Sequence, residues 1–165
     1  MRAADIDETP LPRERPRDCA LRLARAKAAA IPAETGEIVL AADTVVAVGS
    51  RMLGKPRDAA QAGAFLRLLS GRRHRVITAI ALAHAGELRA RAVETVLRFK
   101  RLSAVEIAAY LDCGEWRGKA GAYAIQGRAA AFAPWLSGSY AAVVGLPLVE
   151  TLAMLDAAGY DRRAP

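Results

Sequence analysis

The sequence predicts one domain that combines helices with strands, and three features indicate it. Its 165 residues are a typical length for one domain, and a hydrophobic content of 53% favours a folded core. Residues 38–48 form a nearly unbroken apolar run, rich in β-branched side chains, of the kind found in buried strands. Apolar residues between 62 and 69 recur instead at helical spacing.

Charge and cysteine usage exclude several classes of protein. The net charge is +7, but the basic residues are scattered and aromatic residues make up only 5%, so no basic run alternates with rings that could stack bases. We therefore expect a small polyanionic partner and no nucleic acid. The chain contains no apolar run of the ~20 residues that span a bilayer and no secretion signal, so no membrane partner is expected. Two cysteines without a metal-binding spacing indicate a reduced, cytoplasmic protein.

The first half of the chain contains a helix, a strand and a second helix. The first helix is expected over residues 17–30, where a proline soon stops it. The strand over residues 38–49 leads into a hairpin turn at residues 49–51. The second helix begins after Asp58, which forms a capping box with Gln61, and it ends at a Ser-Gly pair.

The second half continues with two strands and a third helix. Residues 73–83 are expected to form a strand, and residues 93–99 alternate between apolar and polar side chains. This alternation predicts a half-solvated antiparallel pair. Ser103 and Glu106 form another capping box, and the helix that they begin runs to about Cys113.

The last third of the chain is less regular. Residues 115–127 are rich in glycine, which permits close approach of the backbone to a ligand, although a plain connection is the alternative. Residues 129–136 predict a further strand. The final helix begins at Pro147, a residue suited to a first helical turn, and ends near Gly159.

Two charged residues in apolar or turn-forming surroundings mark a candidate site. Asp43 lies inside the predicted strand 38–49, where an unpaired carboxylate costs on the order of several kcal/mol. It is therefore paired with a cation, hydrogen-bonded to backbone amides, or exposed where the strand opens into a cleft. Lys55 follows after a tight turn, and an acid and a lysine brought together in this way favour a site for a phosphate or a metal. Residues 49–55 match a phosphate-binding P-loop, but Pro56 offers neither the hydroxyl nor the N–H that such a loop needs.

Two further polar residues lie in the glycine-rich segment 115–127. Lys119 supplies a charge and Gln126 supplies an amide that can both donate and accept hydrogen bonds. We expect Lys119 to face a phosphate, with a purely structural role as the alternative.

Seven short motifs follow one another along the chain. They are Asp5–Thr9, Leu23–Ala28, Ala42–Val46, Gly54–Pro56, Leu69–Gly71, Lys119–Gly127 and Val144–Pro147. In this order they resemble the Maf family, the septum-formation-inhibitor-like nucleoside triphosphate pyrophosphatases, over essentially the whole chain. The resemblance implies an α/β fold related to that of the inosine triphosphatases, with an elongated mixed β-sheet flanked by helices and two lobes around a deep cleft. It also implies one domain over residues 1–165 and, in many members, a homodimer.

The resemblance implies hydrolysis of a nucleoside triphosphate to the monophosphate and pyrophosphate with a divalent metal cation, Mg²⁺, Mn²⁺ or Co²⁺. Asp43 matches the family's proton acceptor, which activates the attacking water. Glu8, Lys27 and Lys55 match other catalytic residues of the cleft, and Asp43 and Glu8 would hold the metal.

The choice of nucleotide follows from the same resemblance. The pair Asp43–Thr44 and the segment Gly71–Val76 are similar to the branch of the family that acts on dTTP and UTP. In that branch Thr44 and Gln126 would help to choose the base.

The resemblance has one departure, at the N-terminal end. Members of the family begin with a strand, a Ser-x-Arg-Arg loop and a short helix, whereas Met1 here lies only four residues before Asp5. We therefore expect a chain that is shorter than its family at this end. Because the missing loop contributes phosphate and base contacts, a catalytically impaired nucleotide-binding or regulatory protein is the alternative to the enzyme.

Overall fold

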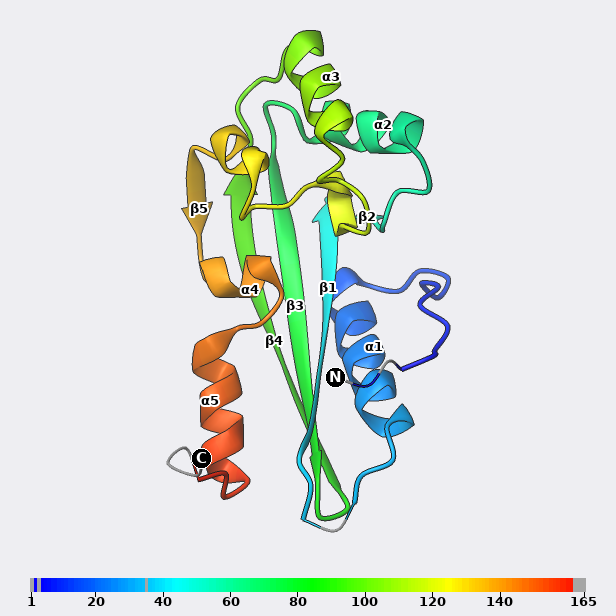
Figure 1. Cartoon of the computed structure of the whole chain (residues 1–165), viewed down its shortest axis with the longest axis vertical. Helices are drawn as coiled ribbons and strands as arrows, with labels where there is room; N and C mark the ends of the chain where they lie inside the picture. The colour runs from blue at the N-terminus through cyan, green and yellow to red at the C-terminus, as the bar shows by residue number, and fades with distance from the viewer. Residues whose placement is uncertain (1, 3, 35, 162–165) are drawn as a thin grey trace.

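A five-stranded, elongated β-sheet forms the centre of the molecule (Figure 1). The structure is a computed structural model and describes residues 2, 4–34 and 36–161. The strands lie in the order β2-β1-β3-β4-β5. Their bounds are Val39–Val48 for β1, Arg51–Leu53 for β2, Arg73–His84 for β3, Glu87–Arg98 for β4 and Trp135–Ser137 for β5.

The four strand pairings of the described residues are all antiparallel. The α/β class is confirmed, whereas the mixture of parallel and antiparallel pairs expected from the resemblance is not found in this sheet. The reason is local, because β1 turns directly into β2 at Gly49 and Ser50, and β3 turns into β4 at Ala85 and Gly86. Tight turns of this kind can join only antiparallel neighbours. The predicted hairpin at residues 49–51 is therefore confirmed.

Helices cover both faces of the sheet. Alternate residues of β3, such as Ile77 and Ala79, pack against α1 (Pro16–Ala30). On the opposite face, Ile80 and its neighbours pack against α5 (Leu148–Ala157). This double cover explains why β3 is almost continuously buried.

A third hydrophobic cluster packs under the elements that Figure 1 shows at the upper end of the sheet. It lies under helices α2 and α3 and two short 3₁₀ segments, η1 and η2. Their bounds are Ala59–Leu69 for α2, Ala104–Cys113 for α3, Ala120–Ala122 for η1 and Arg128–Phe132 for η2. The molecule is thus divided along the sheet into two regions, as the expected two lobes require. None of the helices in the described residues is long and apolar enough to cross a membrane.

The helix caps agree with the sequence in most details. The backbone N–H of Gln61 donates to the side chain of Asp58, but the amide of Gln61 accepts from Arg57 and not from Asp58, so this capping box is half formed. The box of Ser103 and Glu106 is complete. Both helices begin and end within a residue or two of the predicted bounds.

The strand predicted over residues 129–136 is largely wrong. Residues 128–132 form η2, in which Ala129 and Phe132 are buried three residues apart, the repeat of a 3₁₀ helix. Only the last part of the segment pairs with β4, as strand β5. A short helix that the sequence did not indicate, α4 (Tyr140–Val144), follows with Ser139 as its N-cap.

Candidate active site

Two adjoining hollows lie beside the middle of β1, with volumes of 260 and 420 Å³. Both are lined by Asp43, Thr44, Lys55 and Ala120. On this side β2 pairs only with residues 46–48 of β1, so in the described part of the chain residues 39–45 have no strand neighbour there. Because the edge is open, one ligand can reach side chains on both faces of β1.

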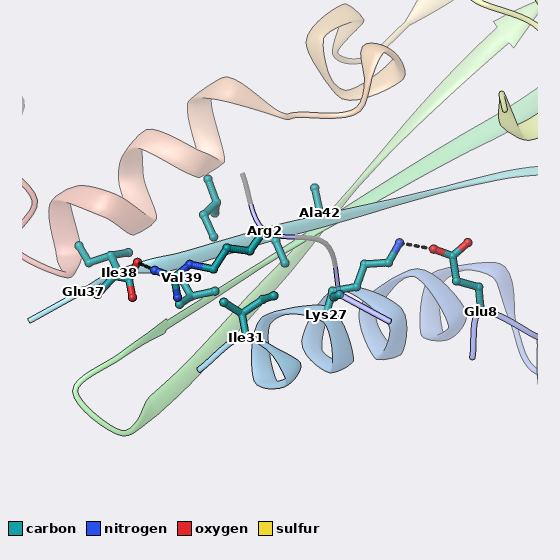
Figure 2. Close-up of a pocket in the computed structure, with 11 residues that line it drawn as sticks. Arg2, Glu8, Lys27, Ile31, Glu37, Ile38, Val39 and Ala42 are labelled. Atoms are coloured by element: carbon teal, nitrogen blue, oxygen red, sulfur yellow. Dashed lines mark hydrogen bonds and ion pairs between the residues drawn. The ribbon is translucent and has the colours of Figure 1, made fainter. Parts of the chain in front are cut away.

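Four charged side chains form a continuous chain at this edge. The Lys27 Nζ lies 2.6 Å from Asp43 Oδ1 and 2.6 Å from Glu8 Oε1. The Lys55 Nζ lies 2.8 Å from the other oxygen of Glu8. Figure 2 shows Lys27 reaching from α1 toward Glu8, which comes from the irregular segment before α1. Three distant stretches of sequence and the turn after β2 therefore meet in one arrangement of alternating charge.

Burial differs along this chain of charges. The side chain of Asp43 is 10% exposed and that of Lys27 is 18% exposed, whereas Glu8 and Lys55 are 41% and 56% exposed. Burial opposes the charge of Lys27, but the hydrogen bonds that Lys27 donates to Asp43 and Glu8 outweigh it and raise the pKa of Lys27. Hydrogen bonds from Lys27 and Lys55 lower the pKa of Glu8. The inner pair, Lys27 and Asp43, is thus shielded from solvent, while the outer pair, Glu8 and Lys55, is accessible to a charged ligand.

The alternation of a strand separates two chemical environments. Asp43 points toward α1, and its neighbour Thr44 points to the other face of the sheet, where its Oγ1 lies 2.9 Å from Thr78 Oγ1. The wall on the Thr44 side is mainly apolar. It includes Val46, Val76, Tyr123, Val143 and Val144. The site therefore has a charged end and an apolar end, on opposite faces of one strand.

The two residues expected from the glycine-rich segment lie in different places. Lys119 is exposed and lines the smaller hollow, which Lys27 and Lys55 also line. Gln126 is exposed in the turn between η1 and η2 and lines neither hollow. The structure thus brings Glu8, Lys27, Asp43, Thr44, Lys55 and Lys119 together and leaves Gln126 apart.

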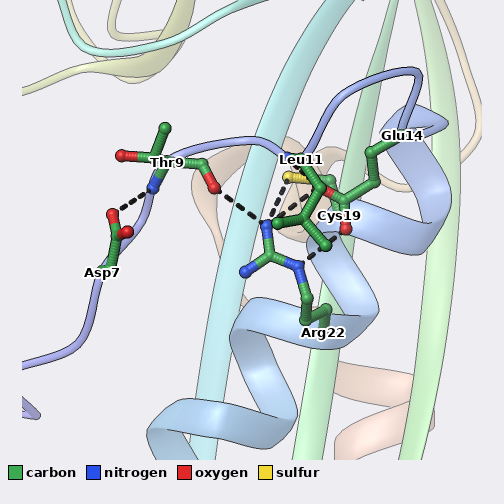
Figure 3. A network of polar contacts seen from close by, with 6 residues as sticks. All are labelled: Asp7, Thr9, Leu11, Glu14, Cys19 and Arg22. Carbon is green, nitrogen blue, oxygen red and sulfur yellow. Dashed lines mark hydrogen bonds and ion pairs between the residues drawn. The ribbon is translucent and has the colours of Figure 1, made fainter.

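An ion pair that the sequence did not indicate holds the segment that carries Glu8 (Figure 3). The Arg22 guanidinium bonds to Glu14 at 2.7 and 2.8 Å and donates at 3.1 Å to the carbonyl of Thr9. The hydrogen bond from Arg22 lowers the pKa of Glu14 to about 2. Because Thr9 follows Glu8 directly, this contact helps to hold the Glu8 carboxylate at the site. Glu14 and Arg22 are eight residues apart across a helix start, a spacing that carries no recognisable signal.

The side chains present can hold a metal only in part. In the described residues no group of three or more His, Cys, Asp or Glu side chains is arranged to bind a metal ion. Asp43 Oδ1 and Glu8 Oε1 each lie 2.6 Å from Lys27 Nζ. The distance between these two oxygens is therefore at most twice 2.6 Å. Mg²⁺ is commonly held by one or two carboxylates together with substrate phosphates. The pair therefore fits a cation that arrives with a nucleotide.

Comparisons with known proteins show the family of this chain. Residues 1–158 match the family described as Maf-like protein. The chain is 57% identical over 160 residues to a dTTP/UTP pyrophosphatase of Roseobacter denitrificans, covering 97% of this chain and 85% of that protein. It is 60% identical to a dTTP/UTP pyrophosphatase of Rhodospirillum rubrum, with 95% and 76% covered, and 58% identical to one of Novosphingobium aromaticivorans, with 98% and 81% covered. The chain belongs to the Maf-like family.

Proposed function

We propose that the protein is a nucleoside triphosphate pyrophosphatase that hydrolyses dTTP and UTP to the monophosphate and pyrophosphate. The observation that supports this most is the chain of alternating charges, Asp43, Lys27, Glu8 and Lys55, beside a hollow with an apolar end. The names of the relatives favour the same activity and give no support to a catalytically impaired regulatory protein.

The lysines account for binding of the triphosphate. A triphosphate carries about four negative charges, and Lys27, Lys55 and Lys119 all line the smaller hollow. The single carboxylate of Glu8 contacts two of these ammonium groups, those of Lys27 and Lys55. Because Glu8 is 41% exposed and Lys55 is 56% exposed, phosphate oxygens can replace the carboxylate at Lys55 with little rearrangement.

The position of Asp43 supports a role as general base. Its carboxylate is 10% exposed, is held by Lys27, and lies at the wall shared by both hollows. A water molecule there loses a proton to Asp43 while its oxygen bonds to phosphorus, and the anhydride bond between the α- and β-phosphates breaks. The products are the monophosphate and pyrophosphate. A divalent cation held by Asp43 and Glu8 would offset the charge that develops on the phosphate oxygens.

The test is release of pyrophosphate from UTP and dTTP by the purified protein with Mg²⁺ or Mn²⁺. Asp43→Asn keeps the size of the side chain and removes the base, so turnover should fall by at least ~100-fold while nucleotide binding persists. Lys55→Ala should raise the KM for UTP with little loss of stability, because the side chain is 56% exposed.

Matched variants distinguish loss of the site from loss of the fold. Arg89→Ala removes a comparable exposed ion pair, with Glu87, in the turn region of the β3–β4 hairpin and should leave KM unchanged. If the Asp43→Asn variant turns over substrate at the parental rate, Asp43 is not the general base. A parent protein that releases no pyrophosphate from either nucleotide would refute the proposal.

A further inference from the structure

Two threonine hydroxyls form a short relay on the apolar side of the site. Thr44 of β1 and Thr78 of β3 are direct partners in the antiparallel register, and their Oγ1 atoms lie 2.9 Å apart. Thr78 is completely buried, and its Oγ1 lies 2.6 Å from the carbonyl oxygen of Ala142 in α4. The relay therefore runs from the backbone of α4, through the interior of the sheet, to the wall of the hollow.

The chemistry of the groups determines the direction of the relay. A carbonyl oxygen can only accept, so the hydroxyl of Thr78 donates its one hydrogen to Ala142. Thr78 Oγ1 then has only lone pairs to offer to Thr44. The hydrogen bond between the two hydroxyls is therefore donated by Thr44. Its own hydrogen is used in this way, and Thr44 Oγ1 presents only lone pairs to a ligand.

The surroundings of Thr44 suit a flat heterocycle. Apolar groups of Val46, Val76 and Val144 line the hollow on this side and offer no competing hydrogen bonds through their side chains. A Cβ atom added at Gly145 would lie 3.8 Å from Thr44 Oγ1, so glycine at this position keeps the space beside the hydroxyl open. A ligand group at this end meets the Thr44 hydroxyl, with its fixed polarity, beside these apolar side chains.

The resemblance to the family implies that Thr44 helps to choose the base, and we propose that Thr78 is the positioning residue that makes Thr44 an acceptor for the ring N3–H of uracil or thymine. The inference rests on the proposed function and adds a physical reason for the choice of base. Uracil and thymine carry a hydrogen on N3, whereas cytosine carries a lone pair there. That lone pair would face the lone pairs of Thr44, so the relay selects UTP and dTTP against CTP.

The experiment compares kcat/KM for UTP, CTP and N3-methyl-UTP. The parent protein should prefer UTP to both of the others. Thr78→Val keeps the shape of the side chain and removes the hydroxyl, which frees the hydrogen of Thr44, so the UTP:CTP preference should fall roughly tenfold. Thr78→Ser restores the hydroxyl and should retain the preference.

Thr151→Val is a matched control. Thr151 is 4% exposed, and its hydroxyl donates at 2.8 Å to the carbonyl of Pro147, outside the hollow. This variant removes an equivalent buried hydrogen bond and should keep the parental UTP:CTP preference. A change of preference in this control as large as in Thr78→Val would overturn the relay, because general destabilisation would then explain both.

Two further results would overturn the inference. One is a folded Thr78→Val that keeps the parental UTP:CTP ratio. The other is efficient cleavage of N3-methyl-UTP by the parent protein, a measurement that decides the question even if Thr78→Val does not fold. Cleavage of neither UTP nor dTTP by the parent would refute the proposed function itself, and the relay's role in base selection with it.

Discussion

The buried histidine of β3 predicts a specific sensitivity to acid. His74 is 2% exposed, its Nε2 lies 2.8 Å from the hydroxyl of Tyr123, and its Nδ1 has no hydrogen-bond partner in the described part of the chain. Edge-on contacts with the rings of Phe99 and Tyr123 complete an apolar environment. Burial therefore lowers the pKa of His74 to about 4.

The sign and size of the effect follow from this pKa. A histidine in the unfolded chain has a pKa of about 6.5, so between about pH 6.5 and pH 4 the unfolded state binds a proton that the folded state does not. Stability is complete above this window and decreases as the pH falls through it. The gap between the two pKa values corresponds to roughly 3 kcal/mol, of which about 2.5 kcal/mol is lost by about pH 4.5.

The assay is urea unfolding of the parent protein and His74→Gln at about pH 7 and about pH 4.5. Glutamine does not titrate, and its amide can still bond to the hydroxyl of Tyr123. Both proteins contain His84 and the same carboxylates, so those contributions cancel in the comparison. The parent should lose about 2.5 kcal/mol more than the variant on acidification. Equal losses in the two proteins would refute the assigned protonation state of His74.

Three further variants test other parts of the structure. Lys27→Met leaves Asp43, 10% exposed, without its cation and should lower the free energy of unfolding at neutral pH by about 2 kcal/mol or more, measured in urea. Gly121→Ala places a Cβ 2.9 Å from Val46 at a φ of +69°, so it should destabilise by about 1–3 kcal/mol and, in kinetic assays, raise the KM for UTP. Ser103→Ala breaks a complete capping box and should lower stability by about 1 kcal/mol, seen as a reduced Tm.

Each of these variants has a result that contradicts its reasoning. Full stability of Lys27→Met would mean that Asp43 does not depend on its ammonium partner. An unchanged KM for UTP in a folded Gly121→Ala variant would show that η1 does not contribute to nucleotide binding at the hollow. An unaltered Tm for Ser103→Ala would show that the cap of α3 contributes nothing measurable.

Local patterns predicted most of the regular elements. Three kinds of signal were sufficient to predict their elements, because each depends on neighbours within a few residues. They are the apolar run at β1, the capping residues Asp58 and Ser103, and the alternation in β4. The failure at residues 129–136 has the opposite cause. Alanine favours helices over strands, and the burial of Ala129 and Phe132 in the third cluster decided that this segment forms a 3₁₀ helix.

For the candidate site, too, local sequence predicted one part and tertiary structure decided the other. Motifs in the sequence identified Glu8, Lys27, Asp43 and Lys55 as candidates, but their pairing depends on α1 lying against β1. The ion pair of Arg22 with Glu14 and the contact of His74 with Tyr123 join residues whose spacing has no pattern, so no reading of the chain alone could have found them.

The sequence by itself determined the periodicities, the caps and the family motifs, since these depend on the chemical nature of near neighbours. Only the tertiary structure decided which face of β1 each side chain occupies and which groups compete for each hydrogen. The polarity of Thr44 is the clearest example, because it follows from a carbonyl of α4 that lies 64 residues beyond Thr78 in the chain. A hydroxyl can donate only once, and folding alone determines where that hydrogen goes.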